Sequence, residues 1–226
     1  MNLFICECDL NATPEEQMAT DAWLLFETSR KHSFGFRVYQ MRDTCTFGRS
    51  QKIKSIEKRE LGVGTLVRRP TGGGAVIHGN DTTFALSIPN SSYLFNLKII
   101  ELYKEIHNLF SRVLDNFSIN TGLFDKQVGS LPDFCFESPN QYDLLEINSG
   151  KKITGSAIKK SKEGILVQGN IFRELYLEDF MIFGRQELIN SYSLSAENIS
   201  SKRYRKCCHW NNLCHQFNSS SWNYSL

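Results

Sequence analysis

Residues 68–78 read RRPTGGGAVIH, so three consecutive glycines follow two arginines and precede a short apolar run that ends in histidine. Glycine permits positive φ angles and lets a bound molecule approach the backbone closely. Arginine carries a permanent, planar charge that pairs with carboxylate or phosphate groups. The stretch therefore predicts a strand–turn–strand unit whose bare backbone holds an anionic or polar head group. A flexible hairpin with exposed arginines is the alternative that these residues leave open.

The glycine stretch differs from the common phosphate-binding motifs. No G-K-[ST] sequence follows it, which excludes a P-loop. The G-x-G-x-x-G pattern that opens a dinucleotide-binding helix is also missing. Any ligand of this stretch is therefore expected to bind in a different structural context.

Strand and helix patterns alternate on both sides of the glycine stretch. Thr13, Pro14 and Glu16 form a capping box that predicts a helix running to about residue 29. Apolar spacings of three and four predict a long core-facing helix over residues 94–117, to which we assign no functional role. Strands are predicted at residues 3–8, 34–41, 44–50, 65–70, 74–78, 82–89, 142–148, 151–158 and 164–172, and shorter helices at 55–61 and near 175–183. The strands at 34–41 and 44–50 are expected to pair through a polar turn.

The composition is that of a soluble globular protein. The chain has 226 residues, an apolar content of 41% and a net charge of +2, which gives no electrostatic argument for a nucleic-acid or membrane-surface protein. No run approaches the roughly 18 apolar residues of a membrane span, and the N-terminus lacks the pattern of a signal peptide. The seven irregularly spaced cysteines are therefore interpreted as reduced thiols of a cytoplasmic protein.

Three segments resemble the lipoate–protein ligase and octanoyltransferase family. The glycine stretch is similar to the family signature R-R-x-[ST]-G-G-G-A-V-x-H, and KKITGSAIKKSKEGILVQGNI at residues 151–171 is similar to its G-[KR]-K-[ILV]-x-G-S-A segment. More weakly, EEQMATDAWLL at residues 15–25 resembles the family's first helix. The resemblance covers roughly residues 3–185. It implies an α/β fold shared with biotin ligases and class II tRNA synthetases, in which helices flank a mixed, largely antiparallel sheet.

The resemblance implies transfer of an eight-carbon acyl group, octanoyl or lipoyl, to one lysine of a carrier domain. Lys152 matches the family lysine that contacts the acyl carbonyl, where an ammonium would stabilise the developing oxyanion. For His78 we favour a buried, hydrogen-bonded ring that fixes the loop over acid–base catalysis. The residues that the resemblance assigns to substrate binding are Arg68, Arg69, Gly72, Gly73, Gly74, His78, Gly155, Ser156 and Ala157.

Cys135 distinguishes between the reactions of the family. PDFCFESPNQYDLL at residues 132–145 resembles the C-F-x-x-P-x-x-Y-[DE]-L segment of cysteine-dependent octanoyltransferases. In those enzymes the cysteine takes the acyl group from octanoyl-acyl-carrier protein as a thioester and passes it to the carrier lysine. A thiolate is a strong nucleophile that a neighbouring lysine favours. We therefore expect Cys135 to be the nucleophile and to lie near Lys152, with a small core residue as the alternative.

Other functions stay open beside the transferase. An ATP-dependent lipoate–protein ligase would need ATP and Mg²⁺, whereas an octanoyltransferase needs no cofactor. A non-catalytic acyl- or carrier-binding protein is a third possibility, because Gln168 stands where the family has a histidine and cannot shuttle a proton. Expected partners are octanoyl-acyl-carrier protein and the lipoyl domains of 2-oxoacid dehydrogenases or the glycine-cleavage H protein, with no nucleic acid and no membrane.

The composition changes near residue 190. We expect a catalytic domain over residues 1–190 and a polar tail or truncated remnant over 191–226, without the accessory domain that many ligases carry. The cysteines and histidines between residues 207 and 215 lack the C-x₂-C spacing of a zinc knuckle, so no metal site is predicted. The KKSK run at 159–162 is interpreted as a solvated hairpin tip, or alternatively as a contact for acidic carrier proteins.

Overall fold

The computed structural model of the chain describes residues 1–6, 12–53, 56, 62–126 and 138–199. Its helices are α1 (Pro14–Arg30), the 3-10 turn η1 (Tyr93–Asn96), α3 (Ile99–Asp115) and α4 (Leu177–Tyr192). Its strands are β1 (Asn2–Cys6), β2 (Phe34–Tyr39), β3 (Thr44–Phe47), β4 (Thr65–Arg68), β5 (Val76–His78), β6 (Thr82–Pro89), β7 (Thr121–Leu123), β8 (Leu144–Glu146), β9 (Lys152–Ser161), β10 (Gly164–Ile171) and β11 (Ser195–Ile199). The predicted α/β class is confirmed.

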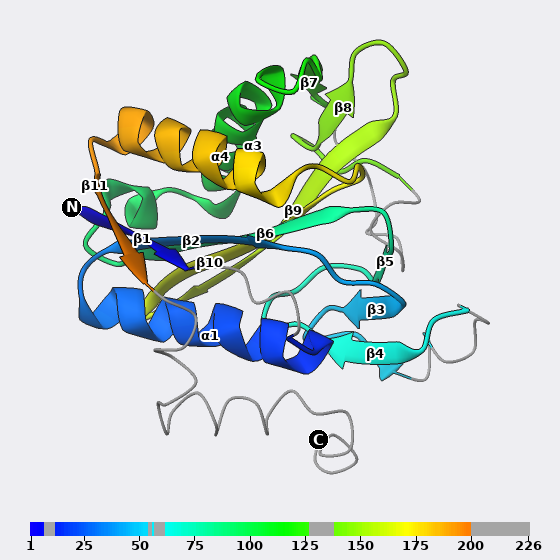
Figure 1. Cartoon of the computed structure of the whole chain (residues 1–226), viewed down its shortest axis with the longest axis horizontal. Coiled ribbons are helices and arrows are strands. Elements are labelled where there is room, and N and C mark those ends of the chain that lie inside the picture. Colours follow the sequence, from blue (N-terminus) through cyan, green and yellow to red (C-terminus); the bar gives the residue numbers. More distant parts are fainter. Residues whose placement is uncertain (7–11, 54–55, 57–61, 127–137, 200–226) are drawn as a thin grey trace.

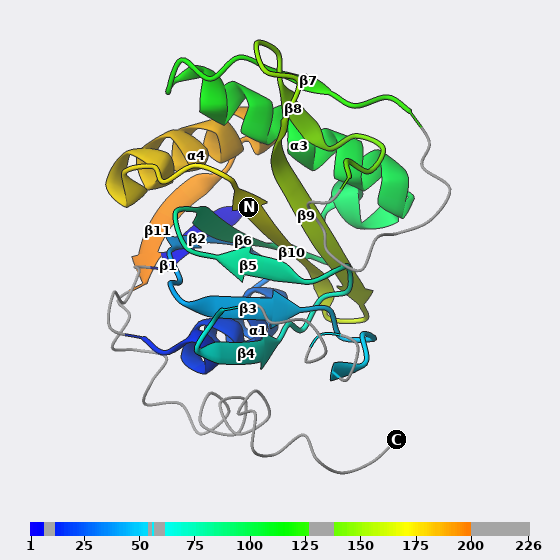
Figure 2. The same cartoon turned by 90° about the vertical axis from the view of Figure 1, so that its right-hand side faces the viewer.

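Eight strands form one mixed sheet in the order β11-β1-β2-β6-β10-β9-β8-β7. Strand β1 runs parallel to β11 and β2, whereas the pairings from β2 through to β7 are antiparallel. Helix α1 covers one face of this sheet, and α3 and α4 cover the other (Figure 1). A three-stranded sheet in the order β4-β3-β5 lies on the same side as α1 (Figure 2). The layers agree with the expected largely antiparallel sheet flanked by helices.

The main core lies between the large sheet and the helices α3 and α4. Leu102, Ile106 and Phe110 of α3 are fully buried, as their spacing of four residues predicts. The ring of Phe110 stacks on Phe84 of β6, with the two ring centroids 3.8 Å apart. Burial of one such side chain contributes roughly 1.5–3 kcal/mol to the free energy of folding. The core therefore fixes α3 against the sheet.

Helix α1 begins at the capping box that the sequence predicts. The Glu16 backbone N–H donates to the Thr13 hydroxyl, and the Thr13 backbone N–H donates to the Glu16 carboxylate at 2.8 Å. Both bonds satisfy backbone donors that a helix start otherwise leaves unpaired. None of the helices in the described ranges is long and apolar enough to cross a membrane.

Three predictions about the strands and helices need correction. The strands at 34–41 and 44–50 do not pair, because β2 joins the large sheet beside β6 while β3 pairs with β4 and β5. Strand patterning indicates which residues are extended but not which distant strand they meet. The long helix starts at Ile99, after η1, and α4 continues to Tyr192. The helix predicted at 55–61 falls largely outside the described residues.

The large sheet extends beyond residue 190. Strand β11 pairs in parallel with β1 at the edge of the sheet, from Asn2 opposite Ser195 to Cys6 opposite Ile199. The predicted tail therefore contributes an edge strand to the large sheet. The division of the chain at residue 190 stays a prediction for the residues that follow β11.

Candidate active site

A pocket of about 410 Å³ opens between the start of α3, strand β9 and the loop that joins β4 to β5. This volume lies within the roughly 300–1,000 Å³ typical of small-molecule sites. The lining residues are Gly72, Gly73, Gly74, Ile99, Ile100, Tyr103, Asn140, Gln141, Ser156, Ala157 and Ile158. The structure therefore brings the predicted glycine triplet, in a loop of the small sheet, and the predicted Ser156–Ala157 pair, in a strand of the large sheet, to one pocket.

The two arginines of the glycine stretch fix two different loops. Arg69 is buried, and its guanidinium donates to the carbonyl oxygens of Gly72 at 2.9 Å and Gly74 at 2.8 Å. Arg68 donates to the carbonyl oxygens of Arg49 and Gln51, both at 2.8 Å. Arg69 thus orders the carbonyl oxygens of the flexible triplet beside it, whereas Arg68 orders those of the loop after β3. The assignment of both arginines to substrate binding stays a prediction.

Glycine is needed at Gly73 in the glycine loop and at Gly48 in the loop after β3, for different reasons. Gly73 has a φ of +87°, which other residues rarely adopt. A Cβ atom at Gly48, in the loop after β3, would lie 2.0 Å from the Gly73 carbonyl oxygen. A Cβ atom at Gly72 would meet nothing within 4 Å, so that glycine leaves space on the pocket wall. The tight packing of Gly48 on Gly73 fixes where the loop meets the pocket.

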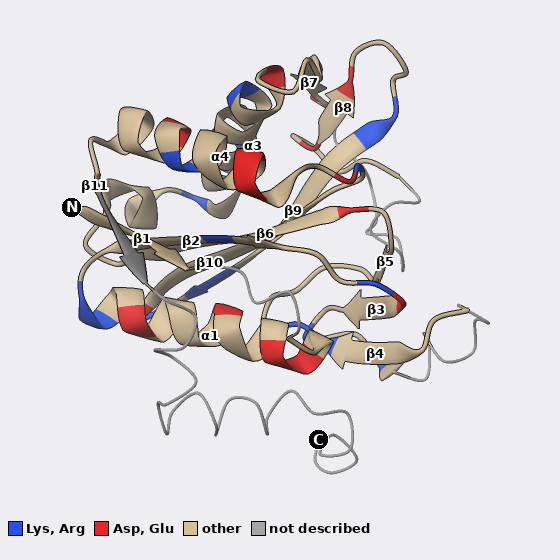
Figure 3. Ribbon diagram, in the orientation of Figure 1, with Lys and Arg blue, Asp and Glu red and all other residues tan. Residues whose placement is uncertain are grey.

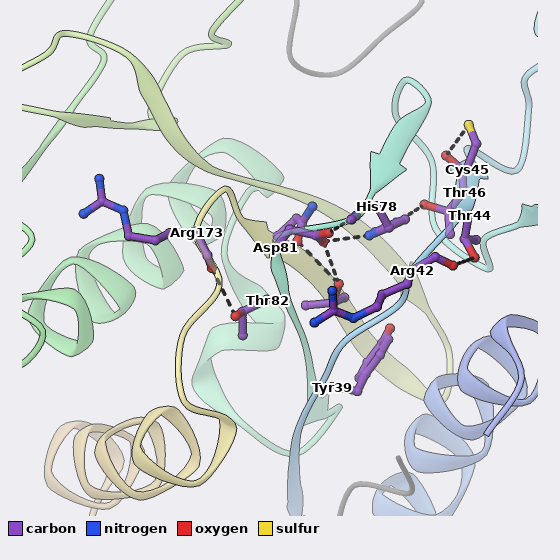
Figure 4. Close-up of polar contacts among 12 residues, drawn as sticks. Tyr39, Arg42, Thr44, Cys45, Thr46, His78, Asp81, Thr82 and Arg173 are labelled. Atoms are coloured by element: carbon purple, nitrogen blue, oxygen red, sulfur yellow. Dashed lines mark hydrogen bonds and ion pairs between the residues drawn. The ribbon is translucent and has the colours of Figure 1, made fainter. Parts of the chain in front are cut away.

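His78 is buried at the end of β5, with both ring nitrogens in hydrogen bonds (Figure 4). Its Nδ1 lies 2.8 Å from the Asp81 carboxylate, which can only accept, so Nδ1 carries a hydrogen. Its Nε2 lies 2.8 Å from the Thr46 hydroxyl, to which Arg69 also donates at 3.0 Å. The ring thus links the small sheet to the arginine that orders the glycine loop. This geometry supports the loop-fixing role that we favour for His78.

Gln168 connects the glycine loop to α1 through the large sheet. Its amide nitrogen donates to Asp21 at 2.6 Å, and its amide oxygen accepts from the Thr71 hydroxyl at 2.6 Å. Asp21 also forms an ion pair with Arg37 at 2.7 Å, with both side chains fully buried. Burial raises the pKa of the Asp21 carboxyl, and the Arg37 charge opposes that shift. Glutamine supplies here both a donor and an acceptor, which this bridge requires.

Lys152 lies at the start of β9 in a buried ion pair. Its Nζ is 2.7 Å from Asp143 Oδ2, and the side chains are 5% and 0% exposed. Asp143 also accepts from the Asn140 backbone N–H at 2.6 Å and from the Tyr103 hydroxyl. The Lys152 side chain folds over Gly155, where a Cβ atom would lie only 2.8 Å from Cε. Gly155 therefore makes room for the lysine beside the pocket.

His107 and Ser156 meet where α3 packs on β9. His107 is fully buried; its Nδ1 lies 2.5 Å from the Tyr142 carbonyl oxygen, and its Nε2 lies 2.9 Å from the Ser156 hydroxyl. The Ser156 backbone N–H donates to the Tyr103 hydroxyl oxygen at 3.2 Å. A hydrogen-bonded chain thus runs from Lys152 through Asp143 and Tyr103 to Ser156 and His107.

We expect His107 to contribute to the loss of unfolding free energy at acidic pH. Burial lowers the pKa of His107 to about 4, against the opposing charge of Asp143, from the value of 6.5 that a free histidine has. Between these values the unfolded chain binds a proton that the folded chain excludes, so stability falls as the pH drops, by up to about 1.4 kcal/mol per pH unit. We expect His107→Gln to lose less stability than the parent between pH 6.5 and 4.5 in urea unfolding. Parallel slopes for the two proteins would contradict this assignment.

The sequence prediction missed part of the site, and part of the prediction lies outside the described residues. Cys135 falls within residues 127–137, so its distance from Lys152 is not described. Tyr103 and His107 lie on the long helix to which we assign no functional role from the sequence, yet they contact the pocket residue Ser156. A polar pair spaced by four residues within an otherwise apolar stripe is the signal that could have identified them. Asp143 could also have been identified, because it is the acidic residue of the C-F-x-x-P-x-x-Y-[DE]-L segment that contains Cys135.

No cluster of three or more histidine, cysteine, aspartate or glutamate side chains able to hold a metal ion occurs in the part of the chain that the structure describes.

The fold resembles solved lipoate–protein ligases. One is the putative lipoate protein ligase Ta0514 from T. acidophilum, with a TM-score of 0.72 and 14% identity, covering 96% of this chain and 94% of that protein. A lipoate-protein ligase A bound with ATP has a TM-score of 0.71 and 14% identity over the same shares of the two chains. At this level of identity the likeness shows the fold alone.

Relatives of higher identity are named octanoyltransferase LipM. The protein from Staphylococcus epidermidis is 32% identical over 142 residues, which is 59% of this chain and 50% of that protein. The protein from Carboxydothermus hydrogenoformans is 31% identical over 175 residues, or 74% and 63% of the two chains. The chain thus aligns with between half and two thirds of the length of these relatives.

A family model also matches most of the chain. The lipoyl protein ligase A/B catalytic domain aligns with residues 13–195, a range that contains the glycine loop, Lys152 and every strand from β2 to β10. This chain therefore belongs to the family of lipoyl protein ligase A/B catalytic domains.

Proposed function

We propose that this protein transfers an octanoyl group from octanoyl-acyl-carrier protein to the acceptor lysine of a lipoyl carrier domain through a thioester on Cys135. The observation that carries this proposal is Lys152, held as a buried ammonium beside a pocket of about 410 Å³ by its ion pair with Asp143. A fixed positive charge at that place suits the oxyanion of acyl transfer. The pocket walls of glycine, alanine and isoleucine suit an apolar chain.

The proposed reaction has two steps. In the first, the Cys135 thiolate attacks the thioester carbonyl of the donor, and the C–S bond to the donor breaks with its electron pair leaving on the donor sulfur. In the second, the amine of the carrier lysine attacks the acyl-Cys135 carbonyl, and the new C–S bond breaks. Lys152 would stabilise the oxyanion in both steps, because the reacting carbonyl is the same group.

The relatives and the charge distribution support the choice of donor and acceptor. The relatives of about 30% identity are named octanoyltransferases, so we propose that no ATP is needed. We also propose that the reaction is cytoplasmic, as the irregular spacing of the seven cysteines suggests. Acidic carrier proteins are attracted to basic surfaces. Lys162 at the β9–β10 turn is exposed and offers such a surface. Figure 3 also shows lysine where the chain enters β9, and of the two residues there Lys151 is exposed whereas the Lys152 side chain is buried against Asp143.

Intact-mass analysis after mixing the protein with octanoyl-acyl-carrier protein, without ATP, tests the proposal. We expect a hydroxylamine-sensitive octanoyl adduct on the parent protein and none on Cys135→Ser. Cys45→Ser is the matched control, because burial raises the pKa of the Cys45 thiol to about 11 and makes it a poor nucleophile. An adduct on Cys135→Ser would refute the thioester. No adduct on the parent, with carrier lipoylation from lipoate and ATP, would identify a ligase instead.

A further inference from the structure

The hydrogen-bond directions around His107 follow from what each partner can do. The Tyr142 carbonyl can only accept, so the hydrogen of the neutral imidazole is on Nδ1. His107 is fully buried, and burial keeps its ring neutral at physiological pH. The remaining nitrogen, Nε2, therefore accepts, and the Ser156 hydroxyl must donate to it across 2.9 Å. The hydrogen of the Ser156 hydroxyl is therefore used in the bond to His107 on α3.

This bond to His107 decides what Ser156 offers to the pocket. Ser156 is partly exposed on the pocket wall, and its backbone N–H is already used by the Tyr103 hydroxyl. With its hydrogen directed at His107, the hydroxyl oxygen presents only lone pairs to a molecule in the pocket. Ser156 is then an acceptor for a donor group such as an amine N–H, and a poor partner for a carbonyl oxygen.

Lys152 lies behind the wall of the same pocket, because its ion-pair partner Asp143 bonds to the lining residues Tyr103 and Asn140. Lys152 and Ser156 lie on one strand, and the Lys152 side chain folds over Gly155, the neighbour of Ser156. Asp143 and Tyr103 connect the two by hydrogen bonds, so their separation is fixed by rigid elements. A cationic donor for a carbonyl and a neutral acceptor for an N–H are the two groups that attack of an amine on a thioester requires.

We propose that Ser156 is a catalytic residue that accepts one N–H of the incoming carrier lysine and that His107 is the positioning residue that keeps Ser156 an acceptor. This inference rests on the proposed acyl transfer and adds to it the binding site of the attacking amine. An amine held by one N–H directs its nitrogen lone pair at the acyl carbonyl beside Lys152. As the C–N bond forms and the C–S bond breaks, the electron pair leaves on sulfur, and the amine proton ends on the departing thiolate.

Steady-state kinetics with a lipoyl domain as acceptor test this proposal. Each variant is measured with two donors. With octanoyl-acyl-carrier protein the amine attacks the proposed acyl-Cys135 thioester, whereas octanoyl-adenylate can be attacked by the amine directly. We expect Ser156→Ala and His107→Leu to lower kcat by about tenfold or more with both donors, since each loses the hydrogen bond that orients the amine. His107→Gln keeps an acceptor toward Ser156 and should restore most of the rate.

Ser111→Ala is the matched control, because the Ser111 hydroxyl lies one turn along α3 from His107 but contacts Thr121 and is not among the lining residues of the pocket. The mass adduct on Cys135 reports the proposed function separately from the amine step. If no octanoyl adduct forms on Cys135 but transfer from octanoyl-adenylate is normal, the thioester is refuted. The rates of the Ser156 variants with octanoyl-adenylate then still test the role of Ser156. Equal rates for Ser156→Ala and Ser111→Ala, lack of rescue by His107→Gln, or no amide from either donor would overturn the inference.

Discussion

Replacing Lys152 by methionine is expected to lower the rate of acyl transfer by about 10²–10³-fold, the range seen when one oxyanion-stabilising donor is removed. Methionine keeps the length and much of the volume of the lysine side chain, so the fold over Gly155 is retained. The loss should appear in kcat, because the interaction forms only as the carbonyl oxygen becomes charged. Rates are compared at saturating lipoyl domain and octanoyl-acyl-carrier protein.

The same substitution leaves Asp143 buried without its counter-charge. A loss of activity could then come from a less stable site as well as from the missing oxyanion donor. Asp143 is 0% exposed, and breaking a buried pair of this kind costs roughly 3–5 kcal/mol in unfolding free energy. The double variant Lys152→Met/Asp143→Asn removes both charges. The introduced amide oxygen can accept from the Asn140 backbone N–H, and its NH₂ group can donate to the Tyr103 hydroxyl oxygen. We expect urea unfolding to show stability recovered in the double variant while activity stays low. Recovery of both together would mean that Lys152 acts only through the stability of the site.

The parts of this protein that the sequence predicted well are those set by neighbouring residues. The capping box of Thr13 and Glu16 and the glycine triplet act over a few residues, and the structure shows each where the sequence places it. Pairing of β3 with β4 and β5 depends on residues as far away as His78 opposite Thr44, and the strand pattern at 44–50 carries no information about them.

In the site, too, the sequence predicts what neighbouring residues determine and misses what distant residues determine. Lys152 belongs to a local motif and is found beside the pocket, whereas its partner Asp143 comes from the segment before β8 and Tyr103 from α3. His107 lies on the buried face of α3, where the apolar pattern around it indicates packing rather than a hydrogen bond to Ser156. Only the crossing of α3 over β9 brings these side chains together, and that crossing is a property of the whole fold.

Replacing Asp21 by asparagine is expected to lower the unfolding free energy by roughly 3–5 kcal/mol, because it removes the counter-charge of a fully buried arginine. Asp21 accepts from Arg37, from the Tyr39 hydroxyl at 2.7 Å and from the Gln168 amide at 2.6 Å. An asparagine has one acceptor oxygen, so its NH₂ group would face donors. For a chain of this size we expect the melting temperature to fall by about 6–20 °C, measured by calorimetry.

Glu27→Gln on the same helix separates the effect of burial from the loss of a charge. Glu27 pairs with Arg30 and Lys31 at 3.0 and 3.1 Å, but both basic side chains are partly exposed, so we expect a cost below about 1 kcal/mol. Similar losses in the two variants would show that burial of the Asp21–Arg37 pair does not matter. Because Gln168 links Asp21 to Thr71 beside the glycine loop, we also expect Asp21→Asn, unlike Glu27→Gln, to reduce acyl transfer at temperatures where it remains folded. The buried charges of α1 and β2 thus support the loop that forms one wall of the pocket.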